Sequence, residues 1–118
     1  MKVFIDAGHN FSGADTGAQG NGLREQDITF VISKKLKELF IDNGDEVMTS
    51  RNTLQDNIGK SLTESLRKRC EMANEWNADL FLSIHCNAYN GTAKGTETLV
   101  YSMPSEAYSI ATEIQKNI

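Results

Sequence analysis

The sequence predicts a three-layer α/β fold, in which a twisted, mostly parallel sheet is flanked by helices. Short β-favouring runs alternate along the chain with longer segments whose apolar residues recur at helical spacing. The 118 residues, 39% of them hydrophobic, suit one domain with a modest core. Such alternation favours parallel strands joined by right-handed crossovers, with helices on both faces of the sheet.

The first half of the chain opens with a strand at residues 3–5, followed by a long polar loop at residues 8–22. Apolar residues then recur at helical spacing from Ile28 to Phe40, and Asn43-Gly44 supplies the stop signal. A second strand is predicted at residues 46–49. These signals predict a strand, a helix and a second strand.

The second helix is predicted to begin at Ser61. Glu64 follows three residues later, as in a capping box. We expect the buried stripe of this helix to consist of Leu62, Leu66, Cys70 and Ala73.

The last third of the chain begins with a nearly all-apolar run at residues 80–84. A strand covered on both faces requires such a run, so we expect it in the middle of the sheet. A turn-rich connection at residues 90–95, a strand at residues 96–101 and a third helix opened by Pro104-Ser105 follow. The helical pattern still continues at Ile118 without a cap, which predicts a C-terminally truncated domain; the alternative is a terminal helix that frays.

Charge and composition exclude several classes of partner. The net charge is −4 with both signs mixed, so we expect neither nucleic acid nor an anionic membrane as a partner. The chain has no apolar run of membrane-spanning length and does not start like a signal peptide, which predicts synthesis in the cytoplasm without an export signal. Its two cysteines do not suggest a disulfide framework. We expect a monomer.

The two histidines of the chain each follow a predicted strand. Because ligands bind at the carboxyl ends of strands in open α/β sheets, His9 and His85 should face one crevice, and Glu25 enters the first helix on the same side. Two imidazoles and one carboxylate leave the fourth tetrahedral position of zinc open, as catalytic zinc sites do. We therefore predict that His9, Glu25 and His85 bind one Zn²⁺ ion.

Each of these residues also has a more ordinary explanation. A histidine after a strand is often simply hydrogen-bonded, and a glutamate in a first helical turn complements the helix dipole. Cys86 is an alternative ligand or nucleophile, but the residue after a ligand on an extended strand should point to the opposite face.

Several short motifs follow one another along nearly the whole chain. They are Asp6-x-Gly8-His9, Leu23-Arg24-Glu25-x-Asp27, Ser50-Arg51, Leu66-x-x-Arg69 with Ala73-Asn74, Ser83-Ile84-His85-x-Asn87-Ala88 and Gly95-x-Glu97. In this order they resemble the zinc-dependent N-acetylmuramoyl-L-alanine amidases of bacterial autolysins and phage endolysins. The resemblance implies zinc on His9, Glu25 and His85, and hydrolysis of the amide between N-acetylmuramic acid and L-alanine in peptidoglycan, at the bacterial cell wall.

The resemblance also implies a general-base glutamate on a segment after the third helix, which this sequence does not contain. Glu97 matches a different family position, so we assign no catalytic residue. A general base contributes about 10²–10⁴-fold in rate. We therefore expect residues 1–118, as an incomplete zinc amidase catalytic domain, to bind zinc but to show little or no amidase activity alone.

Other polar residues are candidates for weaker roles. Arg51 and Asn87 are candidates for substrate binding, and Asp6, Asn10 and Asn87 for orienting ligands or substrate. The ordinary alternatives are a solvated loop arginine and polar side chains that satisfy the loop backbone. Two other functions remain open at this point: a zinc exopeptidase acting on small peptides, and a catalytically inactive module that binds peptidoglycan.

Overall fold

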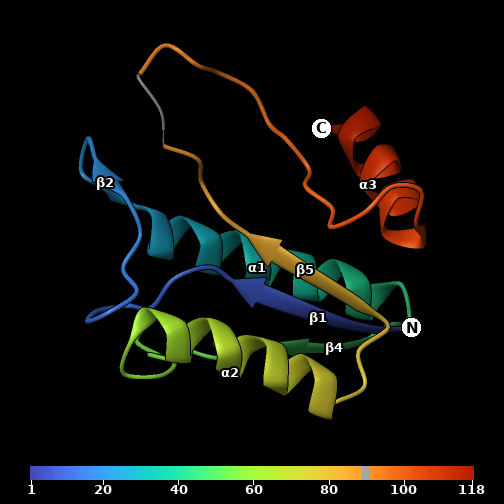
Figure 1. The fold of residues 1–118 in the computed structure, drawn as a ribbon, viewed down its shortest axis with the longest axis horizontal. Helices are drawn as coiled ribbons and strands as arrows, with labels where there is room; N and C mark the ends of the chain where they lie inside the picture. Colours follow the sequence, from blue (N-terminus) through green and yellow to red (C-terminus); the bar gives the residue numbers. More distant parts are fainter. Residues whose placement is uncertain (89–90) are drawn as a thin grey trace. The chain divides into compact units, whose positions relative to one another are not determined.

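The computed structural model describes residues 1–88 and 91–118, which form two units, Met1–Asn87 and Ala88–Ile118 (Figure 1). The first unit contains β1 (Lys2–Ala7), β2 (Gln19–Gly20), β3 (Leu23–Arg24), α1 (Glu25–Asp42), β4 (Glu46–Thr49), α2 (Leu62–Glu75) and β5 (Leu80–Ile84). The second contains α3 (Glu106–Asn117). Strands β1, β4 and β5 form a parallel sheet, and α1 and α2 flank it on opposite sides, which confirms the predicted fold class.

Strand β1 forms the centre of this sheet. Its Val3, Phe4, Ile5 and Ala7 side chains are fully buried, and it pairs with β4 on one edge and β5 on the other. The prediction that residues 80–84 lie mid-sheet is wrong for the described strands, because β5 lies at an edge and Phe81 is 40% exposed. An apolar strand indicates that other elements pack over the faces of the sheet. Whether the strand lies at the centre or at an edge depends instead on how many strands pair with it.

Helix α1 follows the polar loop and packs against β1 and β4. It ends as predicted, with Asn43 as the cap and Gly44 at a φ of 90°. Its buried residues are the largely polar set Glu25, Gln26, Thr29 and Ser33, so this face is selected by the site and by loop contacts more than by apolar spacing. The short hairpin of β2 and β3, which was not predicted, closes the loop before α1.

Helix α2 begins at the predicted cap. The Ser61 hydroxyl accepts a hydrogen bond from the Glu64 N–H at 3.1 Å, although the Glu64 carboxylate accepts from the Lys60 N–H and not from Ser61. The predicted buried stripe is wrong except at Ala73: Leu62 and Leu66 are more than half exposed, Cys70 is exposed, and the buried face is Ser65, Arg69 and Ala73.

The choice of this face follows from a buried ion pair. Arg69 on α2 pairs with Asp6 on β1, and both side chains are almost fully buried. A helix rotated to bury Leu62 and Leu66 would leave the Asp6 carboxylate buried without its partner, which is more costly than exposing two leucines.

The second unit differs from the prediction at one element. Residues 96–101 form no strand in the structure; instead, the Thr98 hydroxyl and the Thr96 carbonyl each bond to Gln115 of α3 at 3.0 Å. β-favouring residues form a strand only where a neighbouring strand is available for hydrogen bonding.

Helix α3 begins as predicted, because the Ser105 hydroxyl accepts from the Tyr108 N–H. Residue 90 of the predicted turn lies outside the described residues. Within the described ranges, no helix combines the length and the apolar character needed to cross a bilayer.

Candidate metal centre

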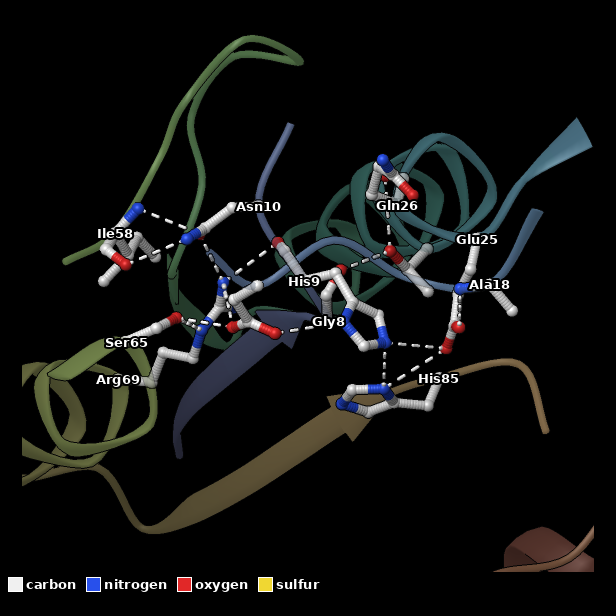
Figure 2. A network of polar contacts seen from close by, with 12 residues as sticks. Gly8, His9, Asn10, Ala18, Glu25, Gln26, Ile58, Ser65, Arg69 and His85 are labelled. Carbon is white, nitrogen blue, oxygen red and sulfur yellow. Dashed lines mark hydrogen bonds and ion pairs between the residues drawn. The ribbon is translucent and has the colours of Figure 1, made fainter. Parts of the chain in front are cut away.

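The two histidines lie at the carboxyl ends of neighbouring parallel strands. His9 comes two residues after β1 and His85 directly after β5, and the two strands end level because Ala7 pairs with Ile84. The Gly8 N–H continues the ladder by donating to the Ile84 carbonyl at 3.0 Å. Glu25, the first residue of α1, completes a group whose side chains converge in Figure 2.

Three donor atoms of this group form a nearly equilateral triangle. His9 Nε2 lies 3.1 Å from Glu25 Oε1 and 3.1 Å from His85 Nδ1, and His85 Nδ1 lies 3.3 Å from Glu25 Oε1. A tetrahedral zinc with bonds of about 2.0–2.2 Å holds its ligand atoms roughly 3.3–3.6 Å apart, a spacing that small side-chain shifts would reach from here. The three residues therefore fit a zinc ion, and His85, whose side chain is 44% exposed, opens the cluster to solvent.

Glu25 is held as the buried, charged member of the cluster. Its Oε1 accepts from the Cys86 N–H at 2.7 Å and its Oε2 from the Ala18 N–H at 3.0 Å. Burial acts to raise the pKa of Glu25, but these two N–H donors and the neighbouring imidazoles outweigh it and lower that pKa. The side chain is therefore a carboxylate, the form that binds a cation.

Cys86 contributes its backbone to the site. Its N–H holds Glu25, whereas burial, and then the Glu25 carboxylate, raise the pKa of the Cys86 thiol. A thiol with a raised pKa is a poor metal ligand and a poor nucleophile at neutral pH. The alternative that assigned Cys86 to the chemistry is therefore disfavoured.

The backbone of His9 is in the left-handed conformation, with a φ of 67°. Neighbouring side chains hold it there: the Gly8 carbonyl accepts from the Thr29 hydroxyl at 2.8 Å, and the His9 carbonyl accepts from Arg69 Nη2 at 2.9 Å. A non-glycine residue in this region carries strain that surrounding contacts must offset. On the imidazole, Nδ1 lies 3.1 Å from Oδ1 of Asp15, a residue that the sequence analysis missed.

Two glycines let the loop and strand approach the cluster. A Cβ added at Gly8 would lie 2.6 Å from His85 Cε1, and one at Gly17 would lie 2.7 Å from Glu25 Cβ and 2.8 Å from His9 Cδ2. These distances are shorter than carbon atoms tolerate, so no other residue fits without moving a proposed ligand. In the sequence, Gly8 belongs to the motif Asp6-x-Gly8-His9, whereas Gly17 is indistinguishable from an ordinary loop glycine.

Arg51 and Asn87 lie in very different surroundings. The alternative of a solvated loop arginine is wrong, because Arg51 is only 2% exposed: its Nη2 donates to the Gln26 carbonyl at 2.6 Å and its guanidinium lies over the Phe30 ring. Asn87 is exposed, two residues after His85. A role for either residue in substrate binding stays a prediction.

Asp6 and Asn10 hold the scaffold beneath the site. Asp6 pairs with Arg69 and accepts from the Ser83 hydroxyl at 2.8 Å. Asn10 is 1% exposed and exchanges two hydrogen bonds with the Ile58 backbone, which ties the first loop to the loop after β4. Neither side chain contacts the three donor atoms through these bonds: Asp6 holds side chains of α2 and β5, and Asn10 holds the loop backbone.

Comparison with known proteins gives a consistent set of relatives. Residues 3–118 match the family described as N-acetylmuramoyl-L-alanine amidase. The chain is 40% identical over 101 residues to the N-acetylmuramoyl-L-alanine amidase CwlM of Bacillus licheniformis, and 37% identical over 107 residues to the endolysin of Bacillus phage SPP1. These alignments cover 86% and 91% of this chain, respectively, but the chain spans only 36% of the length of each relative.

A solved structure of an amidase is also similar to this chain. The CwlD amidase from Clostridioides difficile, determined in complex with the GerS lipoprotein, matches with a TM-score of 0.65 and 32% sequence identity. The match covers 75% of this chain and 49% of that one.

Proposed function

Since the chain belongs to the N-acetylmuramoyl-L-alanine amidase family, we propose that it contributes a zinc site to hydrolysis of the amide between N-acetylmuramic acid and L-alanine in peptidoglycan. The ligands would be His9, Glu25 and His85. The observation that carries the proposal is the triangle of three donor atoms, 3.1–3.3 Å apart, at the carboxyl edge of a parallel sheet. When bound, zinc would lower the pKa of water and polarise the scissile carbonyl.

The three proposed ligands differ in burial, and this difference separates cation binding from substrate access. Glu25 supplies one negative charge from a buried position, fixed by two backbone N–H groups. His9 is the less exposed imidazole, at 20%, and His85 the more exposed, at 44%, so substrate would approach from the side of His85. This opening suits a bulky wall polymer, and the protein would act at the bacterial cell wall.

The supply of a general base is a separate matter. Among the described residues, the two carboxylates placed beside the imidazoles above are both engaged: Glu25 by backbone N–H groups and Asp15 by the Ser65 hydroxyl. Neither is therefore free to take a proton from water. We propose that residues 1–118 are part of one catalytic domain and that alone they bind zinc but hydrolyse peptidoglycan poorly.

A chimera tests the proposed activity. Residues 1–118 would replace the matching residues of the full-length Bacillus licheniformis relative, and products from purified peptidoglycan would be identified by mass spectrometry. The expected products are stem peptides with a free L-alanine amino group, lost on chelation and in a His9→Ala chimera. The unsubstituted host enzyme is the positive control.

Other outcomes of this experiment contradict the proposal. A folded, zinc-loaded chimera that trims free peptides but leaves walls intact would favour an exopeptidase, and one that binds walls without cutting them would favour a binding module. Equally, release of L-alanine peptides by the 118-residue chain alone, at a rate near that of the host enzyme, would contradict its proposed inactivity.

A further inference from the structure

We propose that Asp15 is a positioning residue that fixes the orientation and tautomer of His9 for metal binding, an inference that rests on the proposed zinc site. Asp15 comes from the loop between β1 and β2 and is 7% exposed. Its Oδ1 lies 3.1 Å from His9 Nδ1, and its Oδ2 accepts from the Ser65 hydroxyl at 2.6 Å. One buried carboxylate thus joins a ligand imidazole to helix α2.

The tautomer follows from elementary hydrogen bonding. A neutral imidazole carries one N–H and one lone pair on its two nitrogens. Both ring nitrogens face a carboxylate oxygen at 3.1 Å, Nδ1 that of Asp15 and Nε2 that of Glu25. Glu25 Oε1 already accepts the Cys86 N–H at 2.7 Å, so Asp15 is the better acceptor, and we place the N–H on Nδ1 and the lone pair on Nε2. Nε2 is the nitrogen that lies 3.1 Å from both Glu25 Oε1 and His85 Nδ1. Asp15 thereby directs the metal-binding lone pair of His9 into the cluster.

The support of Asp15 closes a ring of contacts around His9. Arg69 Nε donates to the Ser65 hydroxyl oxygen at 3.2 Å, and Arg69 Nη2 donates to the His9 carbonyl at 2.9 Å. The path runs from the His9 imidazole through Asp15, Ser65 and Arg69 back to the His9 backbone. Figure 2 shows Ser65 and Arg69 on one side of His9 and Glu25 and His85 on the other.

This ring explains why a strained residue can serve as a ligand. The left-handed backbone of His9 is held at its carbonyl, and the imidazole is held separately at Nδ1, so both ends of the residue are fixed before any ion binds. The Asn10 N–H also donates to the Asp15 carbonyl at 2.6 Å, which fixes the loop that carries Asp15. Ligating histidines usually donate their second N–H to such a carboxylate.

Two measurements on the 118-residue chain test the inference. The first is the His9 tautomer in the metal-free protein by ¹⁵N NMR, assigned with a His85→Ala variant that leaves His9 as the sole histidine. We expect the Nδ1–H form in the wild type and its loss in Asp15→Asn. The second is zinc affinity by competition with a chelator, for which loss of such a partner typically costs about 10–100-fold.

Ser65→Ala is the matched variant. It removes one contact of Asp15 but leaves the carboxylate beside His9, so the tautomer should be retained and zinc affinity should fall less than in Asp15→Asn. An Nε2–H tautomer in the wild type overturns the inference even if Asp15→Asn fails to fold. Equal zinc affinity in folded wild type and Asp15→Asn overturns it too. If the wild type binds no zinc, the proposed function fails, while the tautomer measurement still decides the role of Asp15.

Discussion

Gly17 shows how closely the first loop approaches the proposed ligands. A Cβ at this position would meet Glu25 Cβ at 2.7 Å and His9 Cδ2 at 2.8 Å, which are atoms of two proposed ligands and cannot both shift without opening the triangle. The constraint is steric, since no left-handed φ is involved at Gly17. Its effect should therefore appear in metal binding more than in the stability of the metal-free chain.

We expect Gly17→Ala to weaken zinc binding by about 10-fold or more, the scale of effect seen when the surroundings of a ligand are disturbed. Gly20→Ala is the control, because a Cβ at Gly20 meets nothing within 4 Å. Zinc affinity of both variants would be measured by competition with a chelator, with circular dichroism to show that each is folded. Equal affinities would contradict the close packing described here.

At the scale of elements, helix α2 is held by an ion pair that spans 63 residues of sequence. Arg69 and Asp6 are both nearly fully buried, so removing one leaves the other charged and unpaired. We expect Arg69→Ala to lower the free energy of unfolding of the metal-free chain by about 3–5 kcal/mol. Urea titration measures this change.

Arg67→Ala on the same helix is the matched control. Arg67 pairs with Glu71 at the surface, where about half of each side chain is exposed, and such pairs contribute at most about 1 kcal/mol. If the two variants unfolded at the same urea concentration, the buried pair would not be what orients α2.

The loop after β4 supports the site loop and should respond to pH. The Thr53 hydroxyl, followed by the Thr53 N–H, lowers the pKa of Asp56 against the opposing effect of burial. Because the folded pKa lies below the unfolded value of about 3.9, this contribution to stability is present above that value and is lost as pH falls through the folded pKa.

We therefore expect the melting temperature of the wild type to fall more steeply below about pH 4 than that of Asp56→Asn, which lacks the titrating group. Thermal melts of the two proteins between neutral and acidic pH would show the difference. If the melting temperatures of the two proteins fell in parallel over the whole pH range, the Asp56 contacts would contribute nothing to stability.

Local signals in the sequence predicted the helices and the three strands of the parallel sheet, but not how these elements face one another. Ser61, Ser105 and Asn43-Gly44 carry their capping information within a few residues, and the corresponding helix ends were predicted correctly. The inner face of α2 was not, because it depends on an ion pair between distant residues. Likewise, the edge position of β5 and the missing strand at residues 96–101 depend on which strands are available for pairing.

The sequence predicted that the three proposed ligands lie together, but not which residues surround them. The strand ends brought His9, His85 and Glu25 together, because the carboxyl edge of a parallel sheet follows from topology alone. Asp15 and Gly17 depend on the path of the loop through space, which composition does not specify. The burial of Arg51 likewise follows from its packing on Phe30, which no local pattern indicates.

At the scale of the whole molecule, all the proposed ligands and their supporting contacts belong to the unit Met1–Asn87. Zinc should therefore stabilise this unit. In hydrogen exchange of the 118-residue chain, we expect added zinc to slow exchange at residues 8–25 and 80–87. Unchanged exchange at both segments on adding zinc would contradict the proposed site, and a zinc-free His85→Ala sample gives the baseline.

The register between β1 and β5 has a practical consequence for preparing the protein. Side chains alternate between the two faces of a strand, so a slip of one residue in the pairing of Ala7 with Ile84 would turn His85 away from His9 and Glu25. Such a molecule could keep its secondary structure and still hold no ion at this site. Zinc content per chain would then count the correctly registered molecules in a sample, and so serve as an assay of folding fidelity that spectroscopy of secondary structure cannot provide.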